Sequence, residues 1–273
     1  MSYLNQVLRA LFDGLLLPFR SMPPVIGLVV VSLLSAILAL IVFKKTSNQD
    51  RIAEVKRQIH ACLFEIRLFN DDLRAIFRAQ GELLRHNLHY LGLSLVPMAF
   101  MLVPFALAYF HLEQHYGYRP LRPGEAVLVR ALVGEPIETR PEVALEAPEG
   151  ITVLAGPAWF PAAREIDWKI RPEVEGRFAL ALKAGDRVLT KTLRVGGGVQ
   201  RVSPRRPSPR FADELLNPGE DPLPGTGPVA AIEVAYPQRQ WRFLGAEMPW
   251  WVGWLALMLL FALALRNRMG VSI

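Results

Sequence analysis

The sequence predicts an α+β membrane protein with three transmembrane helices, a cytoplasmic antiparallel coiled-coil hairpin and an extracytoplasmic immunoglobulin-like β-sandwich. Apolar segments at 24–45, 91–115 and 248–266 each approach the roughly 20 residues that a helix needs to cross a bilayer. The polar segment 46–90 has heptad spacing, which is typical of a coiled coil. The segment 120–245 alternates apolar and polar residues, as half-buried strands do.

Positive charge gathers beside these apolar segments. The 273-residue chain has a net charge of +6 and is 52% hydrophobic. Lys44 and Lys45 follow the first span, and Arg266 and Arg268 follow the third. By the positive-inside rule both flanks are cytoplasmic. We therefore expect an integral protein of a bacterial inner membrane, with the N-terminus and β domain outside and the hairpin and the tail 267–273 inside. Charge that follows topology in this way argues against DNA as a partner.

Residues 1–23 are expected to form an outer amphipathic helix. Leu4, Leu8 and Leu11 share one helical face, and Asn5 and Arg9 lie on the other. Such a helix can lie in the membrane interface or pack on the protein's own spans. Prolines between this helix and the first span predict a break.

Segment 46–90 is expected to form two helices joined by Asn70–Asp71–Asp72, which supplies a turn and the N-cap of the second helix. Steps of three and four define a seam in each arm, the first through Ile52, Val55, Ile59, Cys62, Ile66 and Phe69, and the second through Leu73, Ile76 or Phe77, Gln80, Leu84 and Leu88. Cys62 is the only cysteine, so the β domain has no disulfide. Basic residues on or beside the hairpin are either a solvated surface or contacts for anionic lipid, ribosomal RNA or a nascent chain: Lys44, Lys45, Arg57, Arg67, Arg74 and Arg78.

The β domain is expected to consist of short strands separated by turn signals. Trp168 lies among alternating residues, as a core tryptophan of a sandwich would. Segment 203–228 is rich in proline and predicts a loop or linker with a short helix at 211–216. Strands are predicted at 126–133, 142–145, 151–154, 166–170, 178–182, 188–195, 229–236 and 240–243.

The motifs of catalysis and cofactor binding are missing. The histidine pair His111 and His115 lacks the further ligands of a metal site, and the glycine run 196–198 is not followed by a Lys-Ser/Thr helix. The spans contain no acid or base at mid-depth, which argues against a pump or transporter. We therefore predict no enzymatic activity, no metal and no cofactor.

The order of elements resembles the core of the YidC/Oxa insertase superfamily. It is most similar to the minimal three-span branch, the archaeal YidC-like proteins and the related subunit of the endoplasmic-reticulum membrane complex. Members insert or chaperone membrane proteins through a lipid-open, hydrophilic groove that faces the cytoplasm. The residues of the resemblance are 4–18, 25–43, Lys44–Lys45, 52–69, Pro97–Met98 and Pro104, within 1–115 and 248–273.

The chain departs from this family twice. Family members often have a basic residue inside the first span, where this chain has only Ser32 and Ser35 as polar residues. The outer β domain is also an addition to the minimal branch.

Two functions remain open from the sequence. The first is an insertase-like protein or intramembrane chaperone, whose hairpin receives a nascent membrane protein, with ribosome contact as an option. The second is a membrane-anchored binding or assembly protein, whose β-sandwich binds an envelope partner while the spans hold other membrane subunits. An insertase predicts a client groove at Ser32, Ser35, Asn87, Ser94, Met98 and Met101.

Overall fold

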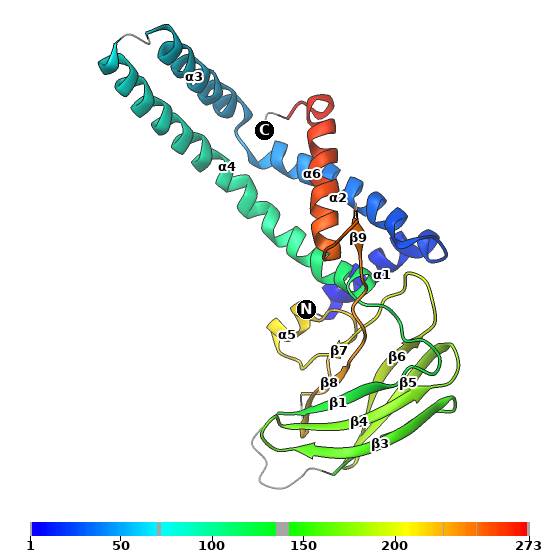
Figure 1. Ribbon diagram of the computed structural model, residues 1–273. Coiled ribbons are helices and arrows are strands. Elements are labelled where there is room, and N and C mark those ends of the chain that lie inside the picture. The colour runs from blue at the N-terminus through cyan, green and yellow to red at the C-terminus, as the bar shows by residue number, and fades with distance from the viewer. Residues whose placement is uncertain (1, 70–71, 135–141, 226, 244, 272–273) are drawn as a thin grey trace. The chain divides into compact units, whose positions relative to one another are not determined.

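The computed structural model describes residues 2–69, 72–134, 142–225, 227–243 and 245–271 (Figure 1). It is an α+β protein with three long apolar helices and antiparallel sheets. The chain divides into two compact units. The β unit comprises Met1–Gly27 and Leu107–Trp251, and the helical unit comprises Leu28–Ala106 and Val252–Ile273.

The three long apolar helices identify an integral membrane protein. They are α2 (Pro24–Thr46), α4 (Leu73–Tyr116) and α6 (Trp250–Met269), and each is long and apolar enough to cross a membrane. Within the helical unit, residues from all three helices and from α3 (Gln49–Leu68) share one apolar cluster around Leu40 and Ile52.

Helices α3 and α4 lie side by side in opposite directions. Arg78 donates to Glu65 near their connected ends, and Lys56 lies over the ring of Tyr90 further along. Asn70 and Asp71 of the predicted turn lie outside the described residues. The predicted N-cap at Asp72 is confirmed, because its Oδ1 accepts a hydrogen bond from the Arg74 N–H at 2.9 Å.

The seam predicted for α3 is correct at its centre, since Ile52, Val55 and Cys62 are buried. Phe69, at its end, is half exposed.

The seam predicted for the second arm is correct at its Ile76 alternative but wrong in register from Gln80 onward. Leu84 and Leu88 are 62% and 61% exposed, whereas Ala79 is fully buried. The more enclosed face of α4 follows Ile76, Ala79, Leu83, His86 and Tyr90 instead. On each of these two faces of α4, residues recur at steps of three and four. Because the spacing is the same, the sequence pattern points to the more apolar face, which is the wrong one here.

One uninterrupted helix also replaces the predicted boundary between the second arm and the second span. Helix α4 runs through residue 90 and contains both Pro97 and Pro104. Gly92 is the only weak helix former near that boundary, and a single glycine costs too little to end a helix of this length.

The β unit has a five-stranded sheet in the order β3-β4-β1-β8-β7 and a three-stranded sheet in the order β2-β5-β6. All neighbouring strands pair antiparallel. Residues of both sheets form one core, in which Trp168 is 2% exposed. The strands are β1 (Val127–Val133), β2 (Val143–Glu146), β3 (Ile151–Phe160), β4 (Glu165–Pro172), β5 (Gly176–Ala184), β6 (Arg187–Val195), β7 (Arg205–Arg206) and β8 (Val229–Val234).

The proline-rich segment 203–228 contains β7 and the short helix α5 (Phe211–Leu216). Asp213 of α5 accepts hydrogen bonds from Arg205, from Ser208 and from Asn217, which fix the segment locally. After β8, a two-stranded ribbon of β9 (Arg242–Phe243) and β10 (Ala246–Glu247) precedes α6.

The N-terminal helix α1 (Ser2–Leu16) packs on the β unit and is followed by a 3₁₀ turn, η1 (Leu17–Phe19). Its buried face is mixed, since Asn5 and Arg9 are buried together with Phe12 and Leu16. Asn5 donates to the Glu214 carbonyl. Val7 and Leu11 are 65% and 58% exposed, so part of the apolar surface of α1 is not covered by the described residues.

Candidate anion-binding site

The six residues of the predicted client groove all lie in the helical unit, and all except Met98 have a local contact there. Ser32 is fully buried and donates to the Leu28 carbonyl at 2.7 Å. Ser35 Oγ accepts from Trp254 Nε1 at 3.2 Å. These two serines therefore contact their own helix and α6.

The other four residues lie along α4. Asn87 and Ser94 donate to carbonyls one turn earlier, those of Leu83 and Tyr90, at 2.9 Å each. Met101 packs against the apolar cluster of the helical unit, whereas Met98 is 53% exposed. No hydrogen bond joins these polar groups to one another within the described residues.

Three of the predicted basic contacts have partners within the helical unit. Lys44 Nζ donates to the Met269 carbonyl at 2.7 Å. Arg57 pairs with Glu54 at 2.6 Å, and Arg78 pairs with Glu65 at 3.3 Å. Lys45, Arg67 and Arg74 are exposed.

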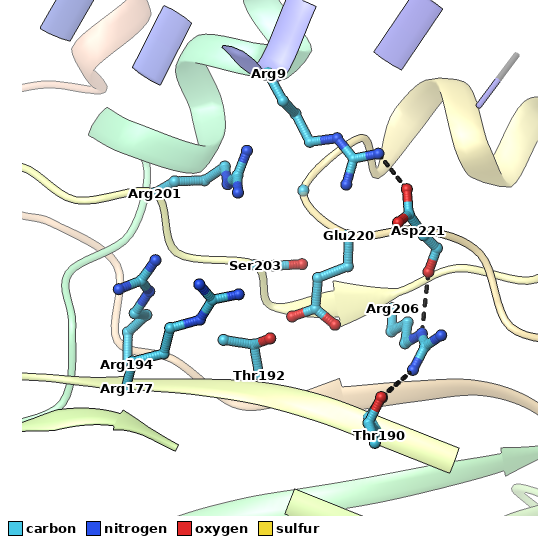
Figure 2. A pocket seen from close by; sticks show the side chains of 11 residues that line it. Arg9, Arg177, Thr190, Thr192, Arg194, Arg201, Ser203, Arg206, Glu220 and Asp221 are labelled. Atoms are coloured by element: carbon cyan, nitrogen blue, oxygen red, sulfur yellow. Dashed lines mark hydrogen bonds and ion pairs between the residues drawn. The ribbon is translucent and has the colours of Figure 1, made fainter. Parts of the chain in front are cut away.

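A different polar site lies in the β unit. It is a cavity of about 190 Å³ lined by five arginines and only two carboxylates, and we call it the arginine pocket (Figure 2). Its charged lining residues are Arg9, Arg177, Arg194, Arg201, Arg206, Glu220 and Asp221, and its other lining residues are Thr190, Thr192, Ser203 and Gly219.

One side of the pocket is the outer face of β6 and its neighbour β5. Thr190, Thr192 and Arg194 alternate along β6, so their side chains share one face. Arg177 of β5 stands directly opposite Arg194 in the strand register. Like charges directly opposite each other destabilise a strand pair. The fold therefore holds two arginines where electrostatics alone would avoid them.

These two arginines also lack a side-chain partner among the described residues. Neither guanidinium has a hydrogen bond or ion pair among the residues that the structure describes, although Arg194 is half-buried. Figure 2 shows both side chains extending from the strands toward Arg201 and Ser203.

Helix α1 and two loops close the other side. Arg9 of α1 pairs with Asp221, and Arg201 pairs with Asp13 of α1 at 3.1 Å. Arg206 donates to Thr190 Oγ1 at 2.8 Å and to the Asp221 carbonyl at 3.0 Å. Arg9, Arg201 and Arg206 are therefore fixed in position by partners.

A buried pair lies behind the pocket. Lys191 is fully buried, and its Nζ donates to the Ser203 carbonyl at 2.6 Å and to Glu220 Oε1 at 2.8 Å. At Gly219 a Cβ would lie 2.6 Å from Gln114 Oε1 and 2.7 Å from the Ser203 Cβ. Only glycine fits there, so the close approach of this loop sets the position of Glu220.

The electrostatics of the pocket favour an anion. Burial lowers the pKa of Arg194, and the charges of Arg177, Arg201 and Arg20 lower it further. Burial likewise lowers the pKa of Arg201, with Asp13 opposing. An anion placed among these guanidinium groups would offset their mutual repulsion and accept hydrogen bonds from them.

The geometry of the lining side chains and the volume of the pocket limit the type of anion that can bind. Planar guanidinium groups bind carboxylates and phosphates through paired N–H donors, and hydroxyl groups add single donors. The cavity of about 190 Å³ has the volume of about six waters at roughly 30 Å³ each, which suits one tetrahedral oxyanion and a few further atoms.

Sequence reasoning missed this pocket. Its arginines come from α1, β5, β6, the loop after β6 and β7, which no linear spacing connects. The available signal was the outward series Thr190, Thr192 and Arg194, three polar residues in alternation on one strand.

Comparison with protein-family models, curated proteins and solved structures finds no match to this chain. The resemblance to the YidC/Oxa superfamily thus rests on the order of elements in the sequence.

Proposed function

We propose that this chain is a membrane-anchored binding protein whose β unit holds a phosphate-bearing envelope partner in the arginine pocket. The observation behind this proposal is the unpaired couple Arg177 and Arg194, set opposite each other in the strand register. A fold keeps such repulsion most readily where it serves binding. Phosphate fits better than a carboxylate because its greater charge and number of oxygens can engage several guanidinium groups at once.

The helical unit supports an anchoring role. Buried Ser32 bonds to its own helix, and Ser35 receives the indole N–H of Trp254. Small residues in spans commonly serve close helix packing, and a hydrogen bond between α2 and α6 agrees with that use.

The proposed placement follows the charge distribution. The N-terminus and the β unit, which we interpret as an immunoglobulin-like sandwich, lie outside a bacterial inner membrane. Helices α3 and α4 form a cytoplasmic coiled-coil hairpin. The exposed apolar residues Val7 and Leu11 of α1 suit contact with the outer lipid interface.

The pocket is tested by titrating inorganic phosphate into the full chain in lipid nanodiscs, followed by calorimetry. We expect Arg194→Gln to weaken binding by about 10- to 100-fold, because a hydrogen bond to a charged group contributes roughly 1.5–3 kcal/mol. Thermal stability should stay equal or rise, since the substitution removes like-charge repulsion. Arg187→Gln changes an exposed arginine of the same strand and is the matched control.

Two outcomes would contradict the proposal. Equal phosphate affinity in both variants means that the pocket binds no phosphate. A lower thermal midpoint for Arg194→Gln means that Arg194 has a structural role. Vesicles of phosphatidylglycerol, compared with soluble glycerol phosphate, distinguish a lipid headgroup from a soluble ligand.

The insertase-like function remains a second proposal because α3 exposes an apolar end. Leu63, Phe64 and Leu68 are 50%, 71% and 75% exposed. A hollow of about 320 Å³ is lined by His60, Leu63, Phe64 and Arg67. Such a surface could receive an apolar segment of a nascent membrane protein.

Site-specific photocrosslinkers at positions 32, 35, 64 and 98 test this second function during synthesis of a short membrane protein. An insertase predicts crosslinks from all four positions to the nascent span, with a lipid-facing position as the control. Crosslinks only to the protein's own helices would reject it.

A further inference from the structure

Helix α4 has a second apolar face, which the chain leaves uncovered. Phe77, Gly81, Leu84, Leu88, Leu91, Leu95, Met98 and Leu102 follow one another at alternating steps of four and three. This is an unbroken heptad spacing over 26 residues, with Gly81 as its only gap. We call these eight residues the α4 stripe.

The α4 stripe is exposed throughout. Its seven large side chains are between 53% and 70% exposed. It lies on a different face of the helix from Ala79, Leu83 and His86, which belong to the enclosed face beside α3. The two faces are roughly 140° apart around the helix, so packing against α3 leaves the stripe exposed.

Lipid would explain only part of this exposure. Residues 91–102 are apolar on every side, as a lipid-facing helix can be. Around Phe77, Leu84 and Leu88 the helix instead has Arg78, Glu82, Arg85 and His89, which require water. Large apolar side chains at heptad spacing beside such charges are typical of a coiled-coil contact.

We propose that two copies of this chain pair through the α4 stripe as a parallel coiled coil. With Leu88 at heptad position a, the flanking e positions hold Arg78, Arg85, Gly92 and Ala99, and the g positions hold Gln80, Asn87 and Ser94. In a parallel pair each g residue meets the e residue of the next heptad on the other copy. Gln80 then meets Arg85, and Asn87 meets Gly92, so no arginine faces an arginine.

The orientation of the chain in the membrane also favours a parallel pair. In an antiparallel pair e positions face e positions, which would bring arginines of the two copies together. Copies of one chain that share one membrane orientation can pair side by side only in parallel. Within the apolar half, Gly92 and Ala99 lie one heptad apart and permit close approach of the two backbones.

Cysteine crosslinking of the full chain in membrane vesicles tests the pairing. In a Cys62→Ala background, single cysteines replace Leu84, Leu88 or Leu95 on the stripe. Matched controls are Glu82→Cys and Phe100→Cys, exposed positions of the same helix away from the stripe. Across a parallel coiled coil, equivalent a or d positions approach closely enough for a disulfide. Oxidation should therefore give a band of twice the chain mass from the stripe positions only.

A second measurement guards against loss of folding. Leu84→Asp should raise the dimer dissociation constant in detergent by about tenfold or more, because pairing would bury a charge. Leu68→Asp, at a more exposed position of α3, should leave the dimer unchanged. Helical circular dichroism should be the same for both variants, since both side chains face solvent in the single chain.

Three results would overturn the proposal. Equal crosslinking at stripe and control positions would mean random collision. A wild-type chain that is monomeric at every concentration would exclude the pair. An adduct of different mass formed only at stripe positions would show that the stripe binds the helix of another protein. Phosphate binding by the β unit should be intact in all these variants, so the two proposals fail independently.

Discussion

At the scale of single residues, the β unit contains charged groups of two kinds. The first kind has partners within the protein. Asp213 accepts hydrogen bonds from Arg205, Ser208 and Asn217. Lys191 is fully buried, and its Nζ is paired with Glu220. Arg177 and Arg194 have no such partners among the described residues. The paired groups, Asp213 and Lys191, hold loops of the β unit in place. The arginines without a partner, Arg177 and Arg194, are available to a ligand.

Asp213, which has partners within the protein, gives a prediction about how the stability of the fold depends on pH. Burial acts to raise the pKa of Asp213, but hydrogen bonds from Arg205 and Ser208 outweigh it, so the pKa is lowered. A lowered pKa contributes stability in full above the unfolded value of about 3.9, and this stability disappears as pH falls through the folded value.

We therefore expect Asp213→Asn to lower the free energy of unfolding at pH 7 by about 1–3 kcal/mol. The difference from wild type should shrink as the pH drops below about 3.9. Thermal unfolding of the full chain in detergent, followed by circular dichroism of the sheets, measures both. Asp186→Asn, at an exposed turn, is the control. A difference that is independent of pH would show that the charge of Asp213 contributes nothing.

At the scale of elements, the sequence predicts which segments are helices and strands better than which faces they bury. All eight predicted strands coincide with strands of the structure, and the short helix is placed at Phe211–Leu216. Alternation and turn residues are local signals, so they survive folding. Two small elements, β7 and β10, are missed because two residues are too few for any periodic signal.

Which face of a helix or strand is buried depends on its tertiary partners, and a local sequence pattern gives no information about those partners. In α1 the polar residues Asn5 and Arg9 are buried, because they contact the Glu214 carbonyl and Asp221, which are more than 200 positions away, while the apolar Val7 and Leu11 are exposed. In α4 two faces repeat with similar spacing, and the less apolar one is beside α3. The arginine pocket was unpredictable for the same reason, since its residues meet only through tertiary pairing.

At the scale of the whole molecule, charge placement gives the remaining prediction. Lys44 and Lys45 are in the last turn of α2, and Arg266 and Arg268 are in the last turn of α6. Cations at these helix ends are also favourable for the helix dipole, but that effect amounts to only 0.3–1 kcal/mol at an exposed site. The helix dipole is therefore too weak to explain these four basic residues, whereas the positive-inside rule accounts for the pair after α2 and the pair after α6 together.

We therefore predict a single topology with both of these helix ends in the cytoplasm, and labelling of single cysteines in intact cells tests it. In the Cys62→Ala background, Asp186→Cys on the β unit should react with a membrane-impermeant maleimide, and Glu82→Cys on α4 should react only after the cells are opened. Both side chains are exposed in the folded chain, so access depends on the membrane alone. Labelling of Glu82→Cys in intact cells would reverse the topology. The arginine pocket would then face the cytoplasm, where a phosphate ligand would have to be sought among soluble metabolites.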